Sequence, residues 1–285
     1  LLTTNLSNYG VVVVRINREN LDFGVYSLEG HLDHQFSVEY DIGSSIELII
    51  DMLVVNIKKV WSIADEYRLI GISIAILGWL FCSDDMRIAY TDGFPELGKK
   101  DIKKELEKVF SDIPIILDHD ANMSAMTEWQ HYSKESLQAR GCLLNLICGI
   151  GIGGSIIING EILKGRNGIA GEIGHMGINF NAGRFNGGVH EKNITGKFED
   201  FASPRAMLKS MQENLFLHPE SSLHEDSTLV DVYEAYEKGD SFAVWLLGRM
   251  AYYLSYGIAS MVFILNPDVI VLGDRICKHE NFKRC

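Results

Sequence analysis

A short glycine-rich stretch, GEIGHM (residues 171–176), places a carboxylate and an imidazole three positions apart, and a second acidic pair begins at Glu199. These residues could serve in one of three ways: metal binding, acid–base chemistry or recognition of a polar ligand. A zinc site needs at least three ligands, but the intervening loop has no cysteine and one histidine, His190. A lone histidine is more often a hydrogen-bonded core residue, yet this segment is too polar for a core. Carboxylates accept hydrogen bonds and imidazole both donates and accepts, so Glu172 and His175 suit a sugar.

A second candidate site is LDHDANMSAMTE (residues 117–128), which ends an apolar strand pattern and opens a helical one. Ligands of α/β sheets usually bind at such a junction. Asp120 could accept a hydrogen bond from a hydroxyl or take its proton as a general base. Asp118 or Asp120 could equally be the cap of the helix, so both interpretations stay open.

A third stretch, CGIGIGGS (residues 148–155), is glycine-rich and lies between two strand patterns. Backbone N–H groups of such a loop can hold a phosphate. A single run of glycines is a weak signal, however, and often marks only a tight hairpin.

The elements that must position these residues alternate between strand and helix patterns. Three strands are predicted within residues 9–40, and a helix follows over 44–67 with Ser44 and Ser45 as candidate caps. Buried strands are predicted at 69–77 and 113–118, with a charged amphipathic helix over 98–110 between them. This alternation predicts an α/β lobe with a largely parallel sheet.

A second lobe is predicted to begin near residue 118. Residues 143–163 repeat the outline of residues 11–32: strand, turn, strand, then a glycine turn at Gly160 or Gly30. Two hairpins can look alike by chance, so the repeat is a hint of internal duplication.

The C-terminal part combines a long apolar helix and a strand. The helix pattern over 241–265 ends before Pro267, because proline disfavours helix in the residue before it. DVIVLG (268–273) is then predicted to be a buried strand, and a closing strand and helix are expected to be missing after it. We predict a smaller α/β lobe, residues 1–117, and a larger α/β lobe, residues 118–285, around one cleft.

Composition bounds the class of protein. The 285 residues are 47% hydrophobic and 22% charged, as in globular proteins, and the net charge of −12 argues against a broad nucleic-acid surface. The longest apolar run, residues 71–82, is too short to span a bilayer, so we expect no membrane contact. Five scattered cysteines without a CxxC pair are typical of reduced thiols in the cytoplasm. The chain starts without Met, and we expect its true start to be absent.

The chain resembles the ROK family of repressors, uncharacterised reading frames and sugar kinases. The resemblance rests on four segments in this order: LDHDAN, GIGIGGSIIINGEILKGRNGIAGEIGHM, GKFEDFAS and LNPDVIVLG. The resemblance spans about residues 69–273, and NGIAGEIGHM is its most specific part. It implies an α/β fold of two ribonuclease-H-like lobes, of the actin/hexokinase type, around a sugar-binding cleft. It further implies a set of sugar-binding residues: Asp120, Glu172, His175, Glu199, His119 and Asp92. Asp120 would be the catalytic base in a kinase member; His119 stands where the family has Asn, and Asp92 lies near a usual Asn.

The departures from the family pattern concern the nucleotide. Kinase members begin with Asp-x-Gly-Gly-Thr on the first strand, which binds magnesium and phosphate. The aligned residues here run from Arg15 to Glu19, without the aspartate or the glycines, and Glu19 would repel a triphosphate. The second phosphate loop lacks both family threonines and is predicted to be degenerate; its glycines are Gly149, Gly151 and Gly153. The late Gly-Gly is Gly273-Asp274.

The family's zinc cysteines are also replaced, by Phe185, Gly187 and Lys197, so we expect no metal and no cofactor. We therefore predict the sugar-sensing effector domain of a ROK transcriptional repressor of the xylose-repressor type, with a monosaccharide effector. We expect a cytoplasmic homo-oligomer, most simply a dimer, that contacts DNA only through an N-terminal helix-turn-helix absent from this chain. The alternative is a divergent ATP-dependent sugar kinase of the glucokinase/fructokinase type. A scaffold without a ligand would leave the polar cluster unexplained.

Overall fold

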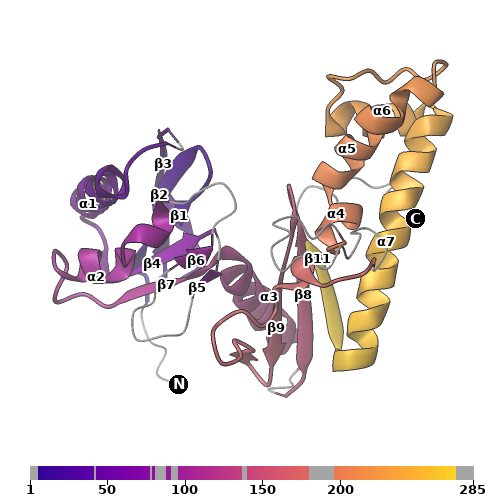
Figure 1. Cartoon of the computed structure of the whole chain (residues 1–285). Helices are drawn as coiled ribbons and strands as arrows, with labels where there is room; N and C mark the ends of the chain where they lie inside the picture. Colours follow the sequence, from indigo (N-terminus) through magenta and orange to yellow (C-terminus); the bar gives the residue numbers. More distant parts are fainter. Residues whose placement is uncertain are drawn as a thin grey trace, which may run out of the picture. The chain divides into compact units, whose positions relative to one another are not determined.

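The structure is a computed structural model that describes residues 6–41, 43–77, 79–80, 88–90, 96–136, 140–179 and 196–273. The chain forms two compact units (Figure 1). Unit 1 comprises Leu1–Met123 and Lys164–Ile169, and unit 2 comprises Ser124–Leu163 and Ala170–Cys285. Unit 1 is therefore discontinuous in sequence.

Unit 1 contains a five-stranded sheet in the order β3-β2-β1-β4-β7. Its strands are β1 (Tyr9–Ile16), β2 (Asn20–Ser27), β3 (Leu32–Glu39), β4 (Arg68–Ile76) and β7 (Ile115–His119). β1, β2 and β3 pair antiparallel, whereas β1, β4 and β7 pair parallel. All five strands predicted for this region are confirmed.

Helix α1 (Ile46–Ile63) covers one face of this sheet. Ser45 caps it by accepting a hydrogen bond from the backbone N–H of Leu48, as the sequence predicted. The predicted helix over 98–110 is shorter in the structure: after a 3₁₀ turn at Leu97–Lys99, α2 covers only Ile102–Glu107, because Asp101 caps a new helix start. A two-stranded sheet is formed by β5 (Trp79–Leu80) and β6 (Ile88–Tyr90).

Unit 2 contains a four-stranded sheet in the order β10-β9-β8-β11. Its strands are β8 (Cys142–Cys148), β9 (Ile152–Ile158), β10 (Glu161–Ile162) and β11 (Val269–Gly273). β8, β9 and β10 pair antiparallel and β11 pairs parallel to β8, which repeats the order and directions of β3-β2-β1-β4. This agreement supports the duplication.

β11 corrects one expectation. The strand is present, but each of its residues is partly exposed and Leu272 is 38% exposed, so the prediction of a buried strand is wrong. An all-apolar sequence indicates that a strand can be buried, whereas burial itself depends on what packs over it.

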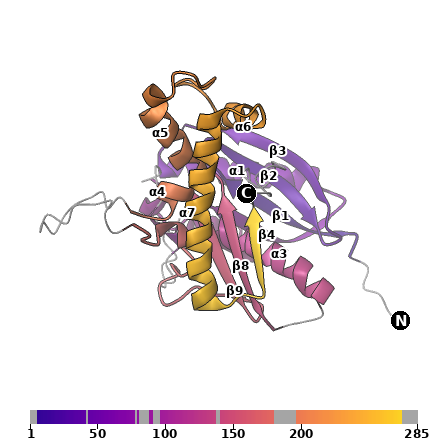
Figure 2. The same ribbon diagram turned by 90° about the vertical axis from the view of Figure 1, so that its right-hand side faces the viewer.

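Helices lie on both faces of the sheet of unit 2. Ala125 and Trp129 of α3 (Asp120–Ser136) pack against Leu143 and Ile157 on one face. The long helix α7 (Ser241–Leu265) lies along the other face, as Figure 2 shows. Three shorter helices pack with it: α4 (Glu199–Ala202), α5 (Pro204–Asn214) and α6 (Leu229–Glu237).

The ends of α7 follow from its flanking residues. Asp240 caps the first turn by accepting from the backbone N–H groups of Phe242 and Ala243. Asn266 ends the helix in a left-handed conformation (φ 45°), and Pro267 follows. Within the described residues, no helix combines the length and the apolar character that a membrane span requires.

Candidate functional site

The GEIGHM stretch lies against the start of β9 in unit 2. Gly171 has φ +94°, a conformation that side chains disfavour, and a Cβ there would lie 3.4 Å from the Cα atom of Ser155. A Cβ on Gly174 would be closer than 3.0 Å to the carbonyl oxygen of Ile152, which real Cβ atoms do not tolerate. Gly171 thus allows the left-handed backbone and Gly174 the close approach to β9, and Glu172 and His175 stand at either end of the 3₁₀ turn Ile173–His175.

Glu199 is brought to the same place by α4. The preceding residue, Phe198, is fully buried with its ring against Gly257 of α7, which fixes the start of α4. The Oε1 atom of Glu199 is 4.0 Å from Nε2 of His175, and its Oε2 atom is 3.9 Å from a guanidinium nitrogen of Arg205. The structure therefore brings two of the predicted sugar residues together, and adds a cation.

The glycine loop forms the tight turn between β8 and β9, with Gly149 and Gly151 in the turn and Gly153 in β9. A Cβ on Gly151 would lie 2.6 Å from Oε2 of Glu199, so the carboxylate of Glu199 packs directly on this glycine and would have to move to admit a side chain there. The turn is the hairpin that the sequence allowed as an alternative. Its use for phosphate stays a prediction.

In unit 1, Asp120 is the first residue of α3 and directly follows β7. Its Oδ2 atom is 3.5 Å from a guanidinium nitrogen of Arg15 on β1, and its Oδ1 atom is 3.2 Å from Nε2 of His119. The side chain of Asp120 is 20% exposed. It is thus accessible and has a cation on one oxygen and an imidazole on the other.

Asp118 differs from Asp120 in its partners. It is buried and accepts hydrogen bonds from the backbone N–H of His119 and from Nδ2 of Asn122, both at 2.8 Å. Its other oxygen accepts from Nζ of Lys164 at 2.6 Å. These contacts satisfy Asp118 internally, which leaves Asp120 as the acidic group of this junction available to a ligand.

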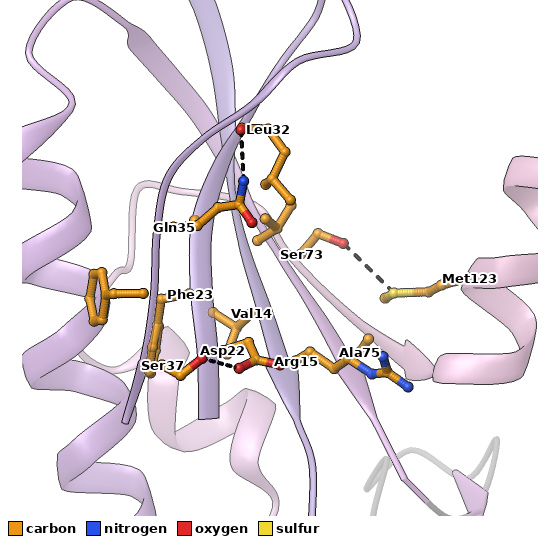
Figure 3. Close-up of a pocket in the computed structure, with 13 residues that line it drawn as sticks. Val14, Arg15, Asp22, Phe23, Leu32, Gln35, Ser37, Ser73, Ala75 and Met123 are labelled. Carbon is orange, nitrogen blue, oxygen red and sulfur yellow. Dashed lines mark hydrogen bonds between the residues drawn. The ribbon is translucent and has the colours of Figure 1, made fainter. Parts of the chain in front are cut away.

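A pocket of about 590 Å³ lies on the face of the unit 1 sheet opposite α1 (Figure 3). Arg15, Asp22, Ser37 and Ser73 are among its polar lining residues, and Met123 closes part of it from α3. Its volume is in the range of small-molecule sites. Arg15 belongs both to the wall of this pocket and to the ion pair with Asp120.

Sequence reasoning missed the three cations beside the acidic residues: Arg15 beside Asp120, Lys164 beside Asp118 and Arg205 beside Glu199. Arg15 and Asp120 are 105 positions apart, so no local pattern signals the pair.

Some predicted positions lie outside the described residues. Asp92 and the loop with His190, Phe185 and Gly187 are in this group. Among the residues that the structure does describe, no three His, Cys, Asp or Glu side chains are grouped as a metal site would require.

Comparison with known proteins places these features in a family. The family model described as "ROK family" matches residues 13–284. A glucokinase of Halalkalibacterium halodurans is 33% identical over 224 residues, which are 74% of this chain and 62% of that protein. A putative xylose repressor of a Caldicellulosiruptor species is 32% identical over 197 residues, 64% of this chain and 45% of that protein.

The solved structure of a ROK family transcriptional regulator, a homologue of the E. coli MLC protein, matches with a TM-score of 0.82 and 22% identity. The match covers 98% of this chain and 69% of that one. The fold is the predicted α/β fold with ribonuclease-H-like units of the actin/hexokinase type. The chain belongs to the ROK family. It is similar both to sugar kinases and to repressors, and it spans less than two thirds of the length of the two relatives named.

Proposed function

We propose that the chain is the sugar-sensing part of a ROK transcriptional repressor and binds a monosaccharide through Asp120, Glu172, His175 and Glu199. DNA would be read by a separate part of such a protein, and two or more copies would act together in the cytoplasm. The sugar would favour one conformation of the sensing part over another, and this shift in population would change DNA binding.

The observation that carries the choice of a sensor over a kinase is the surroundings of Asp120. A kinase needs this carboxylate to take a proton from the attacking hydroxyl, with cations arranged around the phosphates. Here Arg15 is aligned with the kinases' magnesium ligand, and its guanidinium is 3.5 Å from Asp120. A cation at that position would repel magnesium and hold Asp120 as a hydrogen-bond acceptor, which supports binding without phosphoryl transfer.

The half of the site in unit 2 supports the same choice. The turn that kinases use for phosphate carries Cys148 and Ile150 in place of hydroxyl donors. It packs through Gly151 against Glu199, the carboxylate that lies beside His175. The same carboxylate and His175 form a donor–acceptor pair suited to neighbouring hydroxyls of a sugar.

A binding screen tests the proposal. Thermal shift and calorimetry would be measured with xylose, glucose, mannose, fructose and their N-acetylated and phosphorylated relatives. Asp120→Ala and Glu172→Ala should each weaken binding by roughly tenfold or more, because a sugar hydroxyl loses a charged partner worth about 1–3 kcal/mol. Glu213→Ala, which removes an exposed acid on α5, is the matched control and should bind as the wild type does.

Two results would contradict the proposal. Unchanged sugar affinity in Glu172→Ala would remove this residue from the site. Sugar-dependent release of ADP from Mg-ATP, present in the wild type and lost in Asp120→Asn, would establish the alternative, a divergent sugar kinase. For the proposed sensor, calorimetry with Mg-ATP should detect no binding.

A further inference from the structure

The carboxylate of Asp118 joins the end of β7 to the first turn of α3. Its Oδ1 atom accepts one hydrogen bond from the backbone N–H of His119, the last residue of the strand, and one from Nδ2 of Asn122 in the helix. Asp118 and Asn122 are both buried. The two donors lie on either side of Asp120 in the sequence, so a change at Asp118 would reach the backbone that carries Asp120 from both sides.

The helix side of this junction depends on Asp118 more than the strand side does. β7 is held in the sheet by its pairing with β4, in which Asp118 lies opposite Ala75. The first turn of a helix, by contrast, has backbone N–H groups without partners inside the helix. The hydrogen bond from Asn122 to Asp118 ties this turn to the end of the strand. Asp120 is the first residue of that turn, so the direction of its side chain follows the turn.

Lys164 neutralises the charge of Asp118. Its Nζ atom donates to Oδ2 of Asp118 at 2.6 Å, the short distance of a charge-assisted hydrogen bond. Lys164 opens the segment Lys164–Ile169, which belongs to unit 1 together with Asp118. A carboxylate that is only 13% exposed is strongly destabilised when its cation is removed. We expect it then to turn toward water, which would weaken its hydrogen bonds to His119 and Asn122.

The ion pair also matters for the charge around Asp120. Lys164 contacts Asp118, whereas Arg15 contacts Asp120 at 3.5 Å. Two carboxylates that lie two residues apart repel each other unless each is neutralised. Because Asp118 has its own cation, it adds no net negative charge beside Asp120.

We propose that Lys164 and Asp118 are positioning residues of the sugar site. Their ion pair fixes the junction of β7 and α3, and thereby the direction of the Asp120 carboxylate, without touching the sugar. This inference rests on the proposed function, in which Asp120 accepts a hydrogen bond from a sugar hydroxyl. Binding groups must be held within about 0.5 Å of their productive geometry. Loosening the junction therefore lowers the affinity although every residue that contacts the sugar is still present.

The first test is the variant Lys164→Met, which removes the charge and keeps an unbranched side chain. Calorimetry with the sugar that the wild type binds most tightly should show an affinity lowered at least about tenfold. Lys164→Arg, which restores a cation, should recover most of this affinity. Lys108→Met is the matched control. Lys108 forms an ion pair of the same length, 2.6 Å, with Glu105 elsewhere in unit 1, and its removal should leave sugar affinity unchanged.

Adding Asp118→Asn to Lys164→Met separates positioning from direct contact with the sugar. A neutral amide at this position keeps an oxygen for His119 and Asn122 and needs no cation. The double variant should therefore bind sugar at least about threefold more tightly than Lys164→Met alone. If Lys164 bound the sugar itself, the double variant would bind no better than the single one, and the proposal would be overturned.

Hydrogen exchange of the ligand-free protein tests the junction without any sugar. Backbone amides in the first two turns of α3 should exchange at least about fivefold faster in Lys164→Met than in the wild type or Lys108→Met, while those of α1 should not change. Equal exchange in these turns would overturn the proposal, as would unchanged sugar affinity in Lys164→Met. A wild type that binds no sugar would refute the proposed function instead, and the exchange rates would still decide whether the ion pair holds the junction.

Discussion

Replacing Gly257 with alanine probes the contact that fixes the start of α4. A Cβ at this position would lie within 3.0 Å of three ring atoms of Phe198, a fully buried side chain. Overpacking of this kind costs about 1–3 kcal/mol. Alanine also favours the helix by about 1 kcal/mol relative to glycine. The net expectation for Gly257→Ala is a loss of up to about 2 kcal/mol of unfolding free energy.

The same substitution elsewhere in α7 provides the control. A Cβ on Gly248 has no atom within 4 Å, so Gly248→Ala should stabilise the protein by about 0.5–1 kcal/mol through helix propensity alone. The difference between the two variants isolates the clash with Phe198. Urea unfolding, followed by tryptophan fluorescence, measures the unfolding free energy of both variants. Adding Phe198→Leu to the Gly257→Ala variant should recover part of the lost free energy, because the smaller side chain relieves the clash. Equal stabilities for Gly257→Ala and Gly248→Ala would refute the packing argument.

Two further results are expected. Burial alone raises the pKa of Asp240, but hydrogen bonds from groups including the backbone N–H of Ser222 outweigh it and hold the pKa below the ordinary 3.8. The ionised Asp240 cap therefore stabilises the fold at a pH above the ordinary pKa of 3.8, and this stabilisation is lost as the pH falls through the lowered pKa. Asp240→Asn should lower the free energy of unfolding by about 1 kcal/mol at neutral pH, and this difference from the wild type should shrink on acidification. A difference that does not change with pH in urea unfolding would contradict the prediction. Gly174→Ala should push the turn away from Ile152 and weaken sugar binding at least about tenfold. A Cβ on Gly177 would have no atom within 4 Å, so Gly177→Ala should bind sugar normally in calorimetry. Equal losses of sugar affinity in Gly174→Ala and Gly177→Ala would refute the assignment of this turn to the sugar site.

Local patterns predicted most of the secondary structure, but not the helices α4, α5 and α6 or the strands β5 and β6. The alternating and apolar runs gave all five strands of the first sheet, and Ser45 marked the start of α1 because its side chain can replace a missing backbone partner. The end of α2 was less predictable. Lysine and glutamate favour a helix on both sides of its true end at Glu107, so helix propensity does not mark that boundary.

Local sequence patterns did not predict which strands are covered or which residues distant in sequence are in contact. The apolar sequence of β11 cannot tell whether anything covers the strand, and its burial was predicted wrongly. The cations Arg15 and Lys164 reach Asp120 and Asp118 from positions that only the fold brings near. The residues assigned to the sugar came from a family resemblance rather than from such contacts, and their role stays a prediction.

The discontinuity of unit 1 constrains the order in which the chain can fold during synthesis. Domains fold largely as they emerge from the ribosome, and every strand of the first sheet precedes residue 120. The segment Lys164–Ile169 emerges only after the hairpins of unit 2, from β8 to β10. Until then Asp118, whose side chain is 13% exposed, lacks the ammonium group of Lys164. A fragment cut after Met123 would lack it permanently, at a cost of about 1–3 kcal/mol. The two units are compact, yet no single cut separates them, and the first is completed only after part of the second has been made.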